Sequence, residues 1–228
     1  KMMADGVKFK AVEYEGAWHP IKYPWGVHNV FKFLFEKTKK SISKTAKIAK
    51  NAVINGEVII GENVKVFDGA VVNGPCYIGD NSMVATNALV RESHIGNDCV
   101  VGYSTEVARS FLGDEVWFHS NYIGDSVIGN NVSFGAGSVT GNLRLDEKNI
   151  DGQINKLGAI IGDNVRIGVN TSLMPGIRIG GNSLIGAGIV VADDIPEKSF
   201  VRGSFELKIS ENNFDVCALS REKLRKKL

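Results

Sequence analysis

Hydrophobic residues recur at every sixth position over most of this chain, and this period constrains the fold more than any other feature. Two further runs and a stretch of mixed five- and six-residue steps continue the first run. A period of six is neither the 3.6 of an α-helix nor the two of an ordinary strand. The first run is Ile42, Ile48, Ile54, Ile60, Val66, Val72, Ile78, Val84 and Val90; then Ile95, Val101 and Val107; the mixed steps pass through Leu112, Phe118, Ile123, Ile128 and Phe134; the last run is Ile161, Ile167, Leu173, Ile179, Ile185 and Val191.

A short strand followed by a sharp turn explains this period. Three such units close a triangular coil of about 18 residues, with the aliphatic residue inside and glycine, Asn or Asp at the bends. Neighbouring coils then pair as parallel strands about 4.8 Å apart. The sequence therefore predicts an all-β protein, a left-handed parallel β-helix of about eight coils and roughly 38 Å in length. A right-handed parallel β-helix, the alternative, has longer and less regular coils.

The two ends of the chain lack the repeat. In residues 1–41, Lys8–Tyr14 alternates like a strand, and Pro24–Lys40 has the apolar spacing of a helix. We expect this N-terminal segment to cap the open first coil, the β-helix to occupy residues 42–202, and residues 203–228 to form a tail with a short helical segment. This tail would cover the last coil or contact a neighbouring subunit.

Composition excludes several classes of protein. The net charge of +2 over 228 residues does not favour nucleic acid as a partner. No stretch approaches the roughly 20 apolar residues of a membrane span. Three cysteines without a CxxC pair suit buried thiols in a reducing compartment, so we expect a cytoplasmic protein. The scattered carboxylates show no ligand spacing, and no metal site is predicted.

Functional residues are expected on the outside, because a packed β-helix has no internal pocket. Flat faces and a three-fold prism favour a cyclic homotrimer with sites in the grooves between subunits. A polar loop at residues 141–159 interrupts the repeat and is a further candidate for function. His119 is the best candidate for a general base, since histidine titrates near neutral pH. A solvated histidine on a coil face is the alternative.

Several segments resemble the acetyltransferase half of bifunctional sugar-1-phosphate enzymes, the bacterial glucosamine-1-phosphate acetyltransferase/uridylyltransferase and, more closely, its archaeal-type relatives. The resemblance covers about residues 42–202, and the His-x-x-Tyr and Asn-Leu-Arg blocks are its most specific parts. The matching segments are Val101-Gly-Tyr-Ser-Thr-Glu-Val107, His119-Ser-Asn-Tyr-Ile-Gly-Asp-Ser126, Phe134-Gly-Ala-Gly-Ser-Val-Thr-Gly-Asn-Leu-Arg144, Lys156-Leu-Gly-Ala-Ile-Ile-Gly-Asp163 and Met174-Pro-Gly176.

This resemblance implies transfer of acetyl from acetyl-CoA to the amine of an amino-sugar 1-phosphate such as glucosamine 1-phosphate. His119 matches the family's general base. The resemblance further implies a small-molecule sugar phosphate held by Arg91, Arg109, Tyr122, Asn142 and Lys156, and acetyl-CoA against the small residues Ala136 and Ala187.

The sequence departs from the family in three places. Ala108 stands where a lysine commonly holds the sugar phosphate, with Arg109 beside it, and the loop at 141–159 looks shorter. Residues 14–25 resemble the closing segment of a sugar nucleotidyltransferase domain, but Pro20 stands where an aspartate helps to hold a metal. We therefore expect no nucleotidyltransferase site in this chain.

Two other functions remain open. The chain could be a non-catalytic, trimerising and regulatory domain of a sugar-1-phosphate nucleotidylyltransferase, or an acyltransferase with a different acceptor or acyl chain. Bulky side chains in the groove expected to hold acetyl-CoA would favour the non-catalytic domain.

Overall fold

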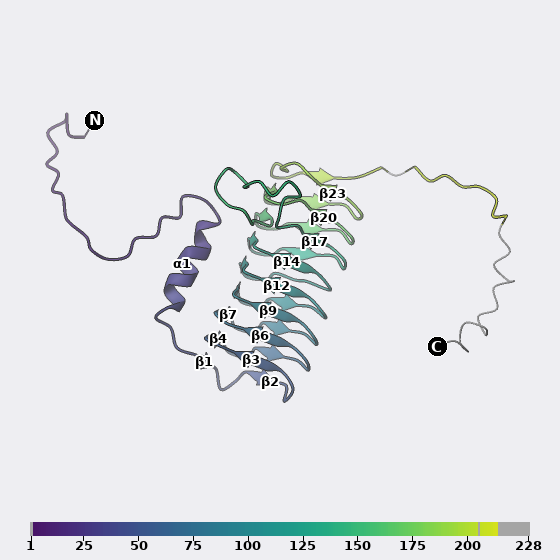
Figure 1. Cartoon of the computed structure of the whole chain (residues 1–228), viewed down its shortest axis with the longest axis horizontal. Coiled ribbons are helices and arrows are strands. Elements are labelled where there is room, and N and C mark those ends of the chain that lie inside the picture. The colour runs from purple at the N-terminus through teal and green to yellow at the C-terminus, as the bar shows by residue number, and fades with distance from the viewer. Residues whose placement is uncertain (1, 205, 214–228) are drawn as a thin grey trace.

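Three columns of short parallel strands form a triangular solenoid, and Figure 1 shows its coils stacked along one axis. The computed structural model describes residues 2–204 and 206–213 of the chain. The fold is the predicted left-handed parallel β-helix. Two of the three columns are sheets of eight strands, in agreement with the predicted number of coils.

Each sheet collects one strand from each coil, which is every third strand along the chain except around Trp117, which forms only isolated bridges. Sheet A contains β1 (Ser41–Ile42), β4 (Val58–Ile60), β7 (Cys76–Ile78), β10 (His94–Ile95), β13 (Phe111–Leu112), β15 (Val127–Ile128), β18 (Ile160–Ile161) and β21 (Arg178–Ile179). Sheet C contains β3 (Val53–Asn55), β6 (Val71–Asn73), β9 (Leu89–Arg91), β12 (Glu106–Ala108), β14 (Tyr122–Gly124), β17 (Val139–Thr140), β20 (Ser172–Leu173) and β23 (Val190–Val191).

Sheet B has two four-stranded parts, which the bridges of Trp117 to Val100 and to Ser133 connect. Its strands are β2 (Lys47–Ile48), β5 (Lys65–Val66), β8 (Met83–Val84), β11 (Val100–Val101), β16 (Ser133–Phe134), β19 (Arg166–Ile167), β22 (Leu184–Ile185) and β24 (Phe200–Val201).

The residues of the six-residue repeat form the core. From Ile60 to Val191 their side chains are buried, and Phe118 and Phe134 pack at 5.1 Å between ring centroids. Burying one such side chain contributes about 1.5–3 kcal/mol. Ile42 is still 39% exposed, since it lies in the first coil and no coil precedes it. The predicted buried thiols are confirmed for Cys76 and Cys99, and burial raises the pKa of each to about 11. Cys217 lies outside the described residues.

Side-chain ladders close the turns between sheets. Between sheets A and B, the side-chain oxygens of Asp80, Asn97 and Asp114 each accept the backbone N–H of a residue in the preceding coil, at 2.6–2.9 Å. The next residue in these turns has a positive φ, as at Asn81 (59°) and Asp98 (54°). Asn and Asp tolerate this conformation, which explains their frequency at the bends.

Helix α1 (Gly26–Phe35) lies beside the β-helix, along the outer face of sheet A (Figure 1). The helix predicted in 24–40 is therefore present over a shorter range, but its predicted place over the first coil is wrong. The imidazole of His94 lies stacked between Tyr77 (4.9 Å) and Phe111 (4.2 Å), and Phe31 of the helix meets its ring edge-on. This outward aromatic stack binds the apolar stripe of α1.

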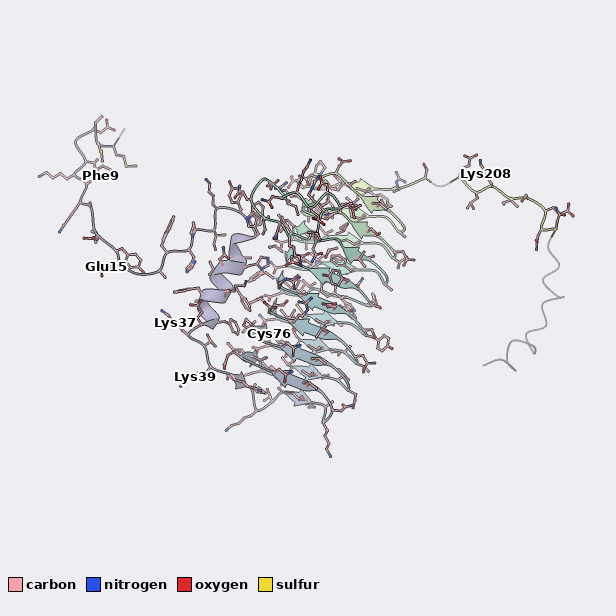
Figure 2. The ribbon with its side chains drawn as sticks, in the orientation of Figure 1. Phe9, Glu15, Lys37, Lys39, Cys76 and Lys208 are labelled. Atoms are coloured by element: carbon pink, nitrogen blue, oxygen red, sulfur yellow. The ribbon has the colours of Figure 1, made fainter. Side chains whose placement is uncertain are left out.

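The segments that contain Phe9 and Lys208 extend away from the solenoid, as Figure 2 shows. The strand predicted at residues 8–14 does not form, because the segment is exposed and no strand edge pairs with it. Residues 206–213 contain neither helix nor strand. The helical segment predicted near the C-terminus, with its basic residues, falls in 214–228 and lies outside the described residues.

Candidate functional site

His119 lies at the turn between sheets B and C, which we call the B/C corner. Its ring is exposed, and its centroid lies 6.5 Å from that of Trp117. Its backbone N–H donates to Oδ1 of Asn121 at 2.8 Å, and the Asn121 amide donates to the carbonyls of Gly135 and Ser138, both at 2.9 Å. Asn121 thus fixes the turn that presents His119. Sequence reasoning missed this role, although Asn121 is in the motif.

The two residues predicted to face acetyl-CoA lie at the same corner, in later coils. The N–H of Gly137, beside Ala136, donates to the carbonyl of Ser120 at 2.9 Å, so Ala136 follows His119 directly along the stack. A Cβ on Gly168 would come within 2.5 Å of the Ala187 nitrogen, which places Ala187 two coils beyond. Both alanines are exposed at this corner.

The turn between sheets C and A, which we call the C/A corner, carries a connected polar network. Arg109 donates from Nε and Nη2 to the two carboxylate oxygens of Asp125, at 2.6 and 2.7 Å. The Asn142 amide donates to Asp125 at 2.5 Å and to the Tyr122 hydroxyl at 3.1 Å. The hydrogen bonds that Arg109 donates to the carboxylate of Asp125 raise the pKa of Arg109, which is a fixed cation. Three of the predicted acceptor residues therefore belong to one network.

The backbone at this corner turns as it does at the other corners. Glu92, Arg109 and Asp125 stack in successive coils with φ of 50°, 48° and 50°. Asp tolerates this left-handed conformation, whereas it costs most other residues of order 1 kcal/mol. Glu115 and Lys198 adopt it at the turns between sheets A and B, both with φ of 58°, so it belongs to the geometry of the solenoid.

The departure at Ala108 has a structural explanation. Ala108 is fully buried, whereas Arg109 reaches the outer corner and pairs with Asp125. The cation at this corner therefore comes from residue 109. Arg91 lies one coil earlier, opposite Ala108 in register, and pairs separately with Glu106 at 2.8 Å.

The loop at 141–159 leaves and rejoins the solenoid at the C/A corner. The N–H of Leu157 donates to the Asn142 carbonyl at 3.0 Å, which closes the base of the loop, and Ile150 is buried against Gly176. Lys156 is exposed beside this closure. Because the loop folds back on the corner, it brings Lys156 and Arg109 into one pocket.

This pocket, which we call the α1 pocket, has a volume of about 310 Å³ and lies between the helix, the corner and the loop. His28 lines it, and burial lowers the pKa of this imidazole. Sequence reasoning missed His28 as a pocket residue, because only the docking of α1 brings it to the corner. The lining residues are Trp25, His28, Asn29, Phe31, Lys32, Glu92, Arg109, Asp125 and residues 154–157.

The structure separates the predicted base from the predicted acceptor residues. His119 and Asp125 stand at opposite ends of the strand segment that carries Tyr122, six residues apart in the chain. At about 3.3 Å per residue, six residues span at most roughly 20 Å, and the bends at both ends shorten this. Within one protomer, the base and the acceptor network therefore lie at two different corners.

Replacing Arg109 with alanine is expected to lower the free energy of unfolding by about 2 kcal/mol, between the effects typical of exposed and buried ion pairs. The reason is that the carboxylate of Asp125, 12% exposed, would lose its cation. Thermal unfolding measures this. Arg144→Ala is the matched control, because the Arg144–Asp146 pair lies at the surface and its loss should leave the melting temperature unchanged. Equal shifts for both variants would contradict the assignment.

A left-handed β-helix built from six-residue repeats is the fold of hexapeptide-repeat proteins. The sequence profile of the GMPPB C-terminal domain matches residues 37–155, just over half of the chain, and that of the hexapeptide repeat of succinyl-transferase matches residues 158–192. The chain belongs to the GMPPB C-terminal domain family of hexapeptide-repeat proteins.

Curated relatives include bifunctional enzymes of archaea. The chain is 45% identical to a "Bifunctional protein GlmU" of Methanococcus maripaludis, over 92% of this chain and 53% of the relative. It is 38% identical to a "Bifunctional sugar-1-phosphate nucleotidylyltransferase/acetyltransferase" of Sulfurisphaera tokodaii, over 88% of this chain and 53% of the relative. The predicted resemblance is confirmed. The chain spans about half the length of these relatives.

Among solved structures, a UDP-N-acetylglucosamine acyltransferase from Arabidopsis is similar, with 19% identity and a TM-score of 0.42, over 72% of this chain and 71% of that chain. In the part of the chain that the structure describes, no helix has the length and apolar character needed to span a membrane. Within residues 2–204 and 206–213, no group of three or more His, Cys, Asp or Glu side chains has the arrangement of a metal site.

Proposed function

We propose that this chain forms a homotrimer that transfers acetyl from acetyl-CoA to the amine of an amino-sugar 1-phosphate of the glucosamine 1-phosphate type. The observation that carries the proposal is the network of Arg109, Asp125, Asn142 and Tyr122 at the C/A corner. Its members Tyr122 and Asp125 belong to the segment whose other end presents His119. The names of its relatives support an acetyltransferase and a sugar 1-phosphate.

Each residue has a role that its environment supports. Arg109 and Lys156 would hold the acceptor phosphate, with Arg91 one coil away, while Tyr122 and Asn142 would contact the sugar. His119 would take the proton from the acceptor amine as its nitrogen forms a bond to the thioester carbon. The carbon–sulfur bond then breaks and CoA leaves as the thiol or thiolate. Ala136 and Ala187 would line the path of its pantetheine arm.

The separation of the two corners supports a site shared between subunits. The C/A and B/C corners of one protomer are separated by strand β14 and the bends on either side of it, a segment that spans at most roughly 20 Å. In a cyclic trimer, the C/A corner of one subunit can meet the B/C corner of the next. We therefore assign the acceptor residues of each site to one subunit and His119 to its neighbour.

A non-catalytic trimerising domain is the second candidate, and one observation favours it. Among the described residues, no side chain makes a hydrogen bond to the His119 ring, whereas catalytic bases are commonly oriented by a third group. In the proposed trimer, the neighbouring subunit or the acceptor would have to supply that orientation.

The deciding experiment is a thiol-release assay on the purified chain with acetyl-CoA. With glucosamine 1-phosphate as the acceptor, we expect one molecule of CoA to be released for each molecule of N-acetylglucosamine 1-phosphate formed. Galactosamine 1-phosphate and free glucosamine are the comparison acceptors, since they test the sugar and the phosphate separately. If a folded trimer released no thiol with any of the three, the non-catalytic domain would be the better account.

A further inference from the structure

The α1 pocket contains an imidazole that nothing in the solenoid explains. Nε2 of His28 is the one buried side-chain nitrogen or oxygen without a hydrogen-bond partner among the described residues. Buried polar groups are nearly always paired, and an unpaired one calls for an explanation such as a missing ligand. His28 lines the pocket together with Arg109 and Lys156, so a ligand in that pocket is the simplest partner for its nitrogen.

The charges of the pocket favour an anion. Its cations are Lys32 from the helix, Arg109 from the corner and Lys156 from the loop; its carboxylates are Glu92 and Asp125. Asp125 is already paired with Arg109. Lys32 and Lys156 form no ion pair with any described residue, so the pocket has two cations available and one carboxylate, Glu92, to oppose them.

The donors for such an anion are side chains rather than the end of the helix. The backbone N–H groups of Gly26, Val27 and His28 already donate to the carbonyls of residues 23–25. A volume of about 310 Å³ is at the lower limit of small-molecule sites, which accommodates a phosphate group with part of a sugar.

We propose that α1 completes the acceptor's phosphate site, and that His28, Lys32 and Lys156 together bind a phosphomonoester in the α1 pocket. This inference rests on the proposed function, which assigns Arg109 and Lys156 to the acceptor. It adds a helix outside the β-helix as a determinant of specificity: His28 discriminates a phosphorylated acceptor from a neutral one.

The protonation of His28 gives a direct readout. Burial keeps the pKa of the free imidazole below its ordinary value, and Lys32 and Arg109 lower it further against the opposing effect of Asp125. A bound dianion favours the imidazolium, so it raises this pKa. The bound state then holds more protons than the free state. Anion binding should therefore strengthen as the pH falls through the interval between the two values.

The test is histidine-ring NMR of the full chain, titrated with inorganic phosphate, with sulfate as a dianion that does not titrate in this range. The His28 signals, assigned from a His28→Gln variant, are expected to move on addition of either anion, and the pKa of His28 is expected to rise with sulfate. Lys32→Ala should weaken phosphate binding roughly tenfold, the effect of one lost charged contact. Lys37→Ala is the matched control, because Lys37 lies over the Phe33 ring and does not line the pocket.

The outcomes separate this inference from the proposed function. His28 signals that ignore both anions would overturn the inference, even in a chain that transfers acetyl groups. A phosphate-dependent shift of His28 in a chain that releases no thiol would support the pocket and contradict the proposed function. Equal phosphate affinity in the Lys32→Ala and Lys37→Ala variants would also overturn the inference.

Discussion

The rate of acetyl transfer is expected to fall by a factor of roughly 10² to 10⁴ in the His119→Ala variant, which is the usual contribution of a general base. The fold should be unaffected, because the ring is exposed and only the backbone of residue 119 takes part in the hydrogen bonds of the corner. Thiol release measures the rate, and light scattering with thermal unfolding measures assembly and stability.

His19→Ala is the control for this variant. It also removes an exposed histidine, but one on the N-terminal segment beside Phe33, far along the chain from the corner. Full activity of His119→Ala would refute the catalytic assignment. Loss of the trimer in this variant would also refute it as stated, since an exposed corner residue should not determine assembly.

The β-helix was predictable because its signal is repeated. Nearly every inward position from Ile60 to Val191 carries a hydrophobic residue, with Thr140 as an exception, so turn irregularities such as the five-residue step from Val90 to Ile95 do not hide the pattern. The helix in residues 26–35 was predictable from its own apolar spacing. Its position was not, because the face that binds it is formed by Tyr77, His94 and Phe111, three outward residues a coil apart.

The candidate site was predictable only in part. The motif around His119 and Tyr122 identified residues of both corners, but a motif says nothing about their separation. That separation follows from the direction of the strand, which places position 119 at one end and position 125 at the other. The ion pair between Arg109 and Asp125, and the place of His28 in the α1 pocket, depend on contacts between segments 16 or more residues apart. Spacing along the chain cannot reveal such contacts.

Mixed trimers are expected to recover activity that neither parent variant has, if each site combines two subunits. Lys156→Ala removes an exposed cation from the acceptor corner and leaves His119 intact, whereas His119→Ala does the reverse. When the two are co-expressed with different affinity tags, tandem purification yields only trimers that contain both. Going round a cyclic trimer, each mixed species has one junction that joins an intact acceptor corner to an intact His119, so kcat/KM should rise to about one third of the wild-type value.

The contrary geometry gives a different result. If His119 and Lys156 of the same subunit served one site, every subunit of a mixed trimer would carry a defect, and kcat/KM would stay at the level of the parent variants. Mixed trimers of wild type and His119→Ala, purified in the same way, are the control. They contain one or two intact sites under either geometry, so they give the kcat/KM expected for a trimer with that number of sites. Recovery in the doubly mutant mixture therefore reports how the two corners meet, independently of how much each residue contributes to the rate.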